Sequence, residues 1–297
     1  MHRFLVLAIA IFLDRLFDKP GKDKPLQAFT NIATYIDNTW HGQEELIAVK
    51  GSQPKRIIEL IVQFKGLLAM LFLVLPCLAL IIFLDTLSQL NFIFDVIFVY
   101  LSIGAEHLRQ NCLAVEQALS KNDHEQTSAA LQSMVNFDIT KMSQQEILNA
   151  CVESVLQNGN YVMLAPIFWF VVLGAPGAVL YRLINQLSIL WNCKNPRYSN
   201  FGRAAGRLNF ILSFIPACLT ALSYMLLGQM KSAWKSLLKL GPLSANAHES
   251  IILAAGAGAL NIEKQPQLPD IMRAYNLAER SLILWLAVIF IRSLSHY

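Results

Sequence analysis

Charged residues are scarce in this chain of 297 residues. Asp, Glu, Lys and Arg together make up 15% of it, whereas hydrophobic residues make up 55%. Soluble globular domains usually carry about 25% charged residues. This deficit argues against an ordinary soluble domain, because much of the surface must face something other than water. The net charge of +4 suits contact with anionic lipid, and it is too small and too dispersed to indicate a nucleic-acid partner.

Cysteine and the common catalytic motifs are also sparse. None of the five cysteines forms a C-x-x-C pair, so we predict free thiols and neither a disulfide framework nor a zinc site. The sequence has no Walker-type phosphate loop, no dinucleotide-binding glycine motif and no H-E-x-x-H motif. The six histidines are scattered, and no third ligand lies near either His–Glu pair, so no resident metal is predicted.

Long apolar runs, in contrast, are frequent. A membrane-spanning helix needs about 20 mostly apolar residues. The run closest to this length without a charge or an amide is residues 67–84, and the others are residues 4–13, 92–105, 161–184, 208–228 and 281–294. No small-residue cleavage site follows the first run, so we expect it to remain in the mature protein. The fold class predicted is therefore an all-α, polytopic integral membrane protein with roughly four to six membrane segments.

The organisation of these segments is left partly open. The sequence Gly174-Ala175-Pro176-Gly177 interrupts residues 161–184, so this run is either one kinked span or a re-entrant helical hairpin. The positive-inside rule places the basic residues 18–66 in the cytoplasm, but residues 185–207 and 229–280 are also basic, and no single topology follows. Residues 106–160 are predicted to form a soluble helical insertion within a single domain of residues 1–297, with a capping box at Ser143–Glu146.

The most specific pattern lies between residues 149 and 209. Its segments are Cys151-Val152-Glu153-Ser154, Leu164-Ala165-Pro166-Ile167-Phe168-Trp169, Gly174-Ala175-Pro176-Gly177-Ala178, Tyr181-Arg182-Leu183-Ile184-Asn185, and the run from Lys194 to Leu208. In order and spacing they resemble the CobD/CbiB family of bacterial inner-membrane proteins. The N-terminal Leu13-Asp14-Arg15-Leu16-Phe17-Asp18-Lys19-Pro20 and the later Asp138-Ile139-Thr140 are similar to two further motifs of that family.

The resemblance implies a function. Members of the family attach aminopropanol or its phosphate to adenosylcobyric acid late in cobalamin synthesis, which is the amide-forming reaction of an adenosylcobinamide-phosphate synthase. Such a ligase is expected to use a nucleotide and Mg²⁺, with a corrinoid as substrate. The resemblance also implies site residues. The catalytic acids would be Glu153, Asp14 and Asp138, and the substrate- or anion-binding residues would be Lys194, Arg197, Tyr198, Arg203, Arg207 and Asn185.

The chain departs from the family pattern at several acidic positions. Gln157, Ser188, Asn200 and Asn209 stand where the family has acids. Because Mg²⁺ favours carboxylate oxygens, these replacements weaken the argument for a metal site and leave enzymatic activity open. The alternative is a non-enzymatic signalling or regulatory protein of the AmpE type. AmpE shares a similar short N-terminal helix and the segment Ala165-Pro166-Ile167-Phe168-Trp169. Neither the ligand nor the oligomeric state follows from the sequence.

Overall fold

The computed structural model describes residues 1–16, 24–40, 55–87, 91–121, 127, 131, 142–193, 195–241, 247–262 and 265–295. All regular structure in these ranges is helical, which confirms the predicted fold class. The α-helices are α1 (His2–Leu16), α2 (Lys24–Trp40), α4 (Lys55–Leu87), α5 (Asn91–Ser102), α6 (Ala105–Ser120), α8 (Gln144–Asn158), α9 (Ala165–Leu173), α10 (Ala175–Leu190), α11 (Arg203–Leu227), α12 (Met230–Leu238), α13 (Ala247–Ala259) and α14 (Asp270–Leu294). A π-helix, η1 (Gly159–Leu164), joins α8 to α9, and a 3-10 turn, η2 (Pro196–Tyr198), precedes α11.

Within the described residues, four helical stretches are long and apolar enough to cross a membrane. They are Arg56–Leu84, Asn91–Ser120, Gln144–Leu173 and Arg203–Leu227. Large apolar side chains cover the outside of the first stretch, where Phe72 is 64% exposed. A contiguous exposed apolar surface of this kind marks contact with lipid or a partner rather than with water. The protein is therefore a multi-pass membrane protein, as predicted.

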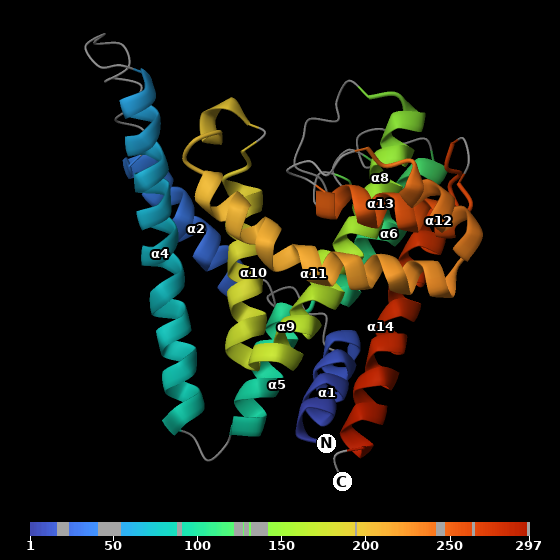
Figure 1. The fold of residues 1–297 in the computed structure, drawn as a ribbon, viewed down its shortest axis with the longest axis horizontal. Helices are drawn as coiled ribbons and strands as arrows, with labels where there is room; N and C mark the ends of the chain where they lie inside the picture. Colours follow the sequence, from blue (N-terminus) through green and yellow to red (C-terminus); the bar gives the residue numbers. More distant parts are fainter. Residues whose placement is uncertain are drawn as a thin grey trace.

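The two ends of the chain lie side by side because α1 and α14 are antiparallel. The rings of Phe4 and Phe290 have centroids 4.8 Å apart, and Arg15 forms a salt bridge with Glu279 at the other end of the pair. Figure 1 shows both termini at the lower edge of the molecule, where α4 also ends and α5 begins. The opposite edge of the molecule, where α4 begins, is called the upper end below.

The interruption at Gly174 is a hairpin turn between two helices. Gly174 has φ of 77°, a conformation that favours glycine, and Pro176 follows within the first turn of α10. A Cβ on Gly177 would lie 2.6 Å from the carbonyl oxygen of Trp169, so α10 packs closely against α9. Residues 161–184 therefore do not form one kinked span, and the helical hairpin is the alternative that the structure shows.

Two clusters of buried side chains hold the helices together. One joins α1, α5, α6, α8, α9, α13 and α14 to the second half of α11, with contributions from η1, α12 and the start of α10. The other joins α2 and α4 to α10 and the first half of α11. The predicted capping box is confirmed, because Ser143 and Glu146 bond to each other's backbone N–H at the start of α8. Both α6 and α8 contribute side chains to the first core, and the boundary proposed for an insertion at residues 106–160 stays a prediction.

The contact between α4 and the segment before α11 depends on Gly66. A Cβ at this position would lie 2.0 Å from the carbonyl oxygen of Phe201. We therefore expect Gly66→Ala to force the two segments apart and to lower the free energy of unfolding by about 1–3 kcal/mol. The measurement is the Tm of the detergent-purified protein. Gly241→Ala is the control, because a Cβ there meets no atom within 4 Å. Equal Tm values for the two variants would contradict the expected contact.

Candidate functional site

The segment that carries the most specific motifs, residues 185–209, folds into a compact turn at the upper end of the molecule. The rings of Trp191 and Phe201 meet edge to face with centroids 4.9 Å apart. Between them Gly202 approaches the backbone so closely that a Cβ would lie 1.8 Å from the carbonyl oxygen of Trp191. Trp191 and Phe201 belong to the core that also contains residues of α2 and α4. The turn is therefore held against these two helices.

Asp37 on α2 is the acid that this turn binds. Its side chain is buried, and its Oδ2 accepts a hydrogen bond of 2.9 Å from the Tyr198 hydroxyl. The Nη2 of Arg197 lies 3.4 Å from the same oxygen. Asp37 was not among the residues predicted from the sequence. Its position on the same helical face as the buried Phe29 and Ala33 is the signal that could have indicated it.

Tyr198 is the donor in this contact at all ordinary pH values. Burial raises the pKa of Tyr198 above its usual value of 10.0, and the hydrogen bond and negative charge of Asp37 raise it further. The hydroxyl therefore remains protonated and keeps donating to the carboxylate. This places Tyr198 and Arg197, two predicted anion-binding residues, in a contact with an internal acid.

Arg203 and Arg207 are placed differently. Both line a groove of about 550 Å³ between α4 and the first turns of α11, and both side chains are exposed. Neither forms an ion pair with another described residue. Across the groove, Gln63 of α4 donates a hydrogen bond of 3.2 Å to Asn200. The first turn of α11 contains no acid, so the groove has a positive rim that suits an anionic ligand.

Asn185 lies inside the contact between α10 and α11 and does not line that groove. It is 1% exposed, and its Nδ2 lies 3.4 Å from the Oδ1 of Asn209. Ser213 also approaches the same oxygen of Asn209, at 3.4 Å. The position of Asn185 therefore indicates that it fixes the two helices. The predicted residue Lys194 lies outside the described residues.

The predicted acids come from other elements. Asp14 is fully buried at the end of α1, where its Oδ2 accepts a hydrogen bond of 3.1 Å from the backbone N–H of Glu106. This bond satisfies a donor in the first turn of α6. Glu153 has an exposed side chain on α8. Asp138 lies outside the described residues, so its relation to the other two stays a prediction.

The described residues do not by themselves provide the Mg²⁺ site that the family resemblance implies. No three His, Cys, Asp or Glu side chains converge among them. Several buried or partly buried acids already pair with cations: Asp37 with Arg197, Glu106 with Arg109, Asp270 with Arg273 and Glu279 with Arg15. Each of these carboxylates is engaged with a cation in the folded protein, so this set does not fit a Mg²⁺ ion.

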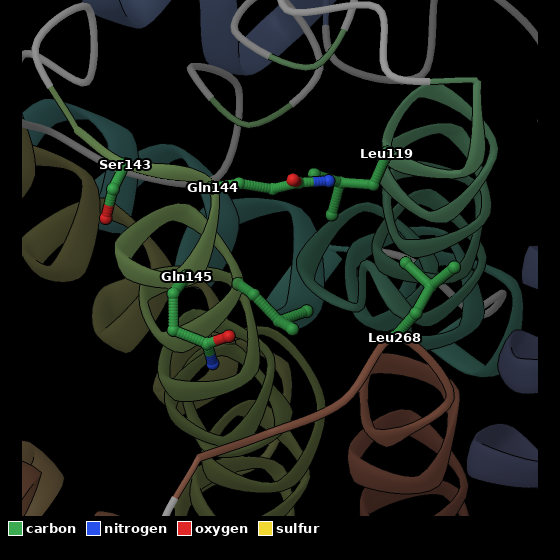
Figure 2. Close-up of a pocket in the computed structure, with 6 residues that line it drawn as sticks. Leu119, Ser143, Gln144, Gln145 and Leu268 are labelled. Atoms are coloured by element: carbon green, nitrogen blue, oxygen red, sulfur yellow. The ribbon is translucent and has the colours of Figure 1, made fainter.

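A second hollow, of about 470 Å³, lies where the end of α6 meets the start of α8 and the approach to α14. Figure 2 shows Gln144 extending toward Leu119 across it, with Leu268 on the opposite side from Ser143. None of the described residues that line this hollow is charged. It lacks the cations that a phosphorylated substrate requires, so the groove between α4 and α11 is the better candidate site.

Comparisons with known proteins decide the family. The family model described as CobD/Cbib protein matches residues 7–266. The chain belongs to the CobD/CbiB family. It is 34% identical to the cobalamin biosynthesis protein CobD of Chromobacterium violaceum, over 97% of this chain and 96% of the relative. Identity is 33% with CobD of Stutzerimonas stutzeri, over 88% and 82% of the two chains, and 27% with a probable CobD of Pyrococcus abyssi, over 98% and 97%. No solved structure matches this chain.

The bond between Tyr198 and Asp37 predicts a stability difference. Tyr198→Phe removes a hydrogen bond to a buried carboxylate, and we expect it to cost about 1.5–3 kcal/mol of unfolding free energy. Arg197→Gln removes a longer contact, 3.4 Å, made by a half-exposed guanidinium, and such a contact usually contributes less than about 1 kcal/mol. Thermal unfolding of both variants in detergent measures this order, and a larger loss in Arg197→Gln would contradict it.

The same hydrogen bond predicts that the stability of the folded protein depends on pH in the alkaline range. The pKa of Tyr198 is higher in the folded than in the unfolded protein, so its contribution to stability is complete below pH 10.0 and falls as the pH rises through the raised pKa. The alkaline fall in Tm should therefore be smaller in Tyr198→Phe than in the unmodified protein. An equal fall in both would show that Tyr198 does not titrate in this way.

Proposed function

We propose that this protein acts in cobalamin biosynthesis, at the step that joins aminopropanol or its phosphate to adenosylcobyric acid. The observation that carries the proposal is the similarity to the Chromobacterium CobD protein, which extends over 97% of this chain at 34% identity. Similarity over the full length supports a shared activity better than a shared segment does. The proposed location is the inner membrane of a bacterial cell, with a corrinoid substrate at the membrane boundary.

The chemistry requires an anion site and a proton acceptor. When the amine nitrogen attacks the carboxyl carbon of the corrinoid, one carboxylate oxygen must leave, so the carboxylate must first be activated. A nucleotide with Mg²⁺ would supply that activation by transferring a phosphoryl group to the oxygen, which would then leave as phosphate. In this chain, Arg203 and Arg207 would hold a phosphate group of a substrate, because they line a groove and no described acid neutralises them. Tyr198 and Asp37 would hold the preceding turn in place.

The acids implied by the family remain part of the proposal. Glu153 is exposed, so it could accept the proton that the amine loses when the C–N bond forms. Asp14 binds the first turn of α6, so its proposed contribution is to position Glu106 and Arg109 beside it. Asp138 and Lys194 stay in the proposed site on the strength of the family motifs alone.

A second candidate function is an AmpE-like regulatory or ligand-binding role without catalysis. It is favoured by the amides that replace family acids. Asn200 accepts a hydrogen bond from Gln63, and Asn209 accepts one from Asn185. The first contact joins α4 to the turn before α11, and the second joins α10 to α11. The same groove would then bind an anionic ligand and signal its presence through α4 and α11.

Complementation separates the two functions. The gene is expressed in a bacterial strain that lacks its own CobD/CbiB enzyme and that needs cobalamin made from cobyric acid for growth. The proposed function predicts growth. Absence of growth, with the protein detected in the membrane fraction, would rule out the ligase and favour the regulatory role.

Substitution of the two groove arginines tests the anion site. Arg203→Gln with Arg207→Gln should raise the amount of aminopropanol phosphate needed for half-maximal growth by at least about tenfold, since two charge-assisted contacts are lost. Lys231→Gln with Lys235→Gln is the matched control. It removes the same charge from exposed positions on α12, which do not line the groove. An equal effect of both pairs would show that only net charge matters.

A further inference from the structure

The helix α11 has an unusual distribution of polarity. Its exposed side carries a stripe of apolar residues, each between 38% and 64% exposed: Ile211, Ile215, Leu219, Leu222 and Leu226. Its buried side carries polar residues: Asn209, Ser213, Thr220 and Ser223. The spacing of three or four residues puts each set on one face. Apolar residues such as Leu212 and Met225 share the buried side with these polar ones. A helix whose outer side is entirely apolar over this length faces lipid or a partner rather than water.

The buried polar face is fully engaged with other helices. The hydroxyl oxygens of Ser213 and Tyr181 lie 3.2 Å apart, and Thr220 donates a hydrogen bond of 2.9 Å to Asn160 of η1. Trp285 of α14 donates a hydrogen bond of 2.9 Å to Ser223. These contacts fix which side of α11 faces outward. The apolar stripe is therefore on the outside because the buried contacts orient α11 in this way.

The contacts of α11 also fix its level in the membrane. Its first half lies across the groove from Gln63 to Met70 of α4, where the uncharged run 67–84 begins. Its second half meets α14 at Trp285, near the beginning of the apolar run 281–294. Figure 1 shows that α4 and α14 both run from the upper to the lower end, while α11 passes across the molecule between them.

Both halves of α11 therefore lie near the same boundary of the apolar layer. If α11 crossed the layer, it would contact α4 near the beginning of the run 67–84 and α14 near the end of the run 281–294, or the reverse. The length and composition of α11 would allow it to cross, but these contacts place it along the layer.

The charges at the two ends of the stripe agree with this placement. Arg203 and Arg207 precede it, and Lys231 and Lys235 follow it on α12 beside Trp234, which is 57% exposed. Lys, Arg and Trp are typical of the headgroup level. A crossing helix would put one pair of cations on each side of the membrane, whereas the positive-inside rule favours one side for both.

We propose that α11 lies in the plane of the membrane, in the leaflet at the upper end of the protein, and that its apolar stripe binds the acyl chains of that leaflet. The described parts of the basic segments 18–66, 185–207 and 229–280 then lie on one side, which removes the conflict in the topology that the sequence left open. The proposal concerns the membrane contact alone and stands whether or not the protein is a ligase.

Cysteine labelling decides whether α11 crosses. The parent carries Cys193→Ser, which removes the exposed thiol, and its residual labelling through the four other cysteines is the blank. One cysteine is then added before α11 (Ser199→Cys), after it (Lys231→Cys) or at the lower end (Ser295→Cys), all at exposed positions. A membrane-impermeant maleimide is added to intact cells or to inside-out vesicles. The proposal predicts that positions 199 and 231 react in the same preparation and that 295 reacts in the other. Reaction of 199 and 231 in opposite preparations would overturn it. If the Lys231 variant accumulates poorly, Lys235→Cys takes its place.

A spin label identifies what covers the stripe. A nitroxide at Leu222→Cys, in protein reconstituted into phospholipid vesicles, should be relaxed by dissolved oxygen and not by a water-soluble nickel chelate. The same label at Lys235→Cys should respond to the chelate and serves as the control. Strong relaxation of the Leu222 label by the chelate would contradict burial in lipid. Protection from both reagents would show that a protein surface, such as a second copy of the chain, covers the stripe instead.

Discussion

A polar group in the apolar layer must find a partner within the protein, and the arrangement of this chain follows from that constraint. An unpaired polar group costs several kcal/mol in hydrocarbon. Asp14 meets the constraint with a backbone N–H of α6, Thr220 with Asn160, and Ser223 with Trp285. Each of these contacts turns a polar side chain inward. The apolar side chains of the same helices are left on the outside, where lipid can cover them.

The same constraint explains why the candidate site lies near the upper boundary of the layer. Exposed arginines are costly at the centre of a bilayer but tolerated at its edge, where the headgroups and water reach them. Arg203 and Arg207 lie just before the apolar stripe of α11, so an anionic substrate could bind them from the aqueous side. The apolar floor of the groove, formed by residues such as Met70, lies beside them. A site of this kind suits a reaction between a polar amine and a large amphipathic substrate.

The sequence predicted the fold class and the family, because both depend on long patterns. The apolar runs indicated helices, and the motifs between residues 149 and 209 indicated CobD/CbiB membership. The hairpin at Gly174 stayed undecided, since the sequence shows a break but not the direction of the chain after it. Asp37 was missed because its role depends on the turn at Tyr198, which is distant in the sequence. Asn185 contacts Asn209 between two helices, a pairing that no local pattern indicates, and its role in substrate binding stays a prediction.

The most direct test of the proposed function is an assay with purified protein in lipid nanodiscs. Adenosylcobyric acid, aminopropanol phosphate, ATP and Mg²⁺ are added, and mass spectrometry follows the amide product. The proposed function predicts a product whose mass equals the sum of the acid and the amine less one water. The CobD protein of Chromobacterium violaceum, assayed in the same way, is the reference. Product from the reference and none from this protein would contradict the proposed function.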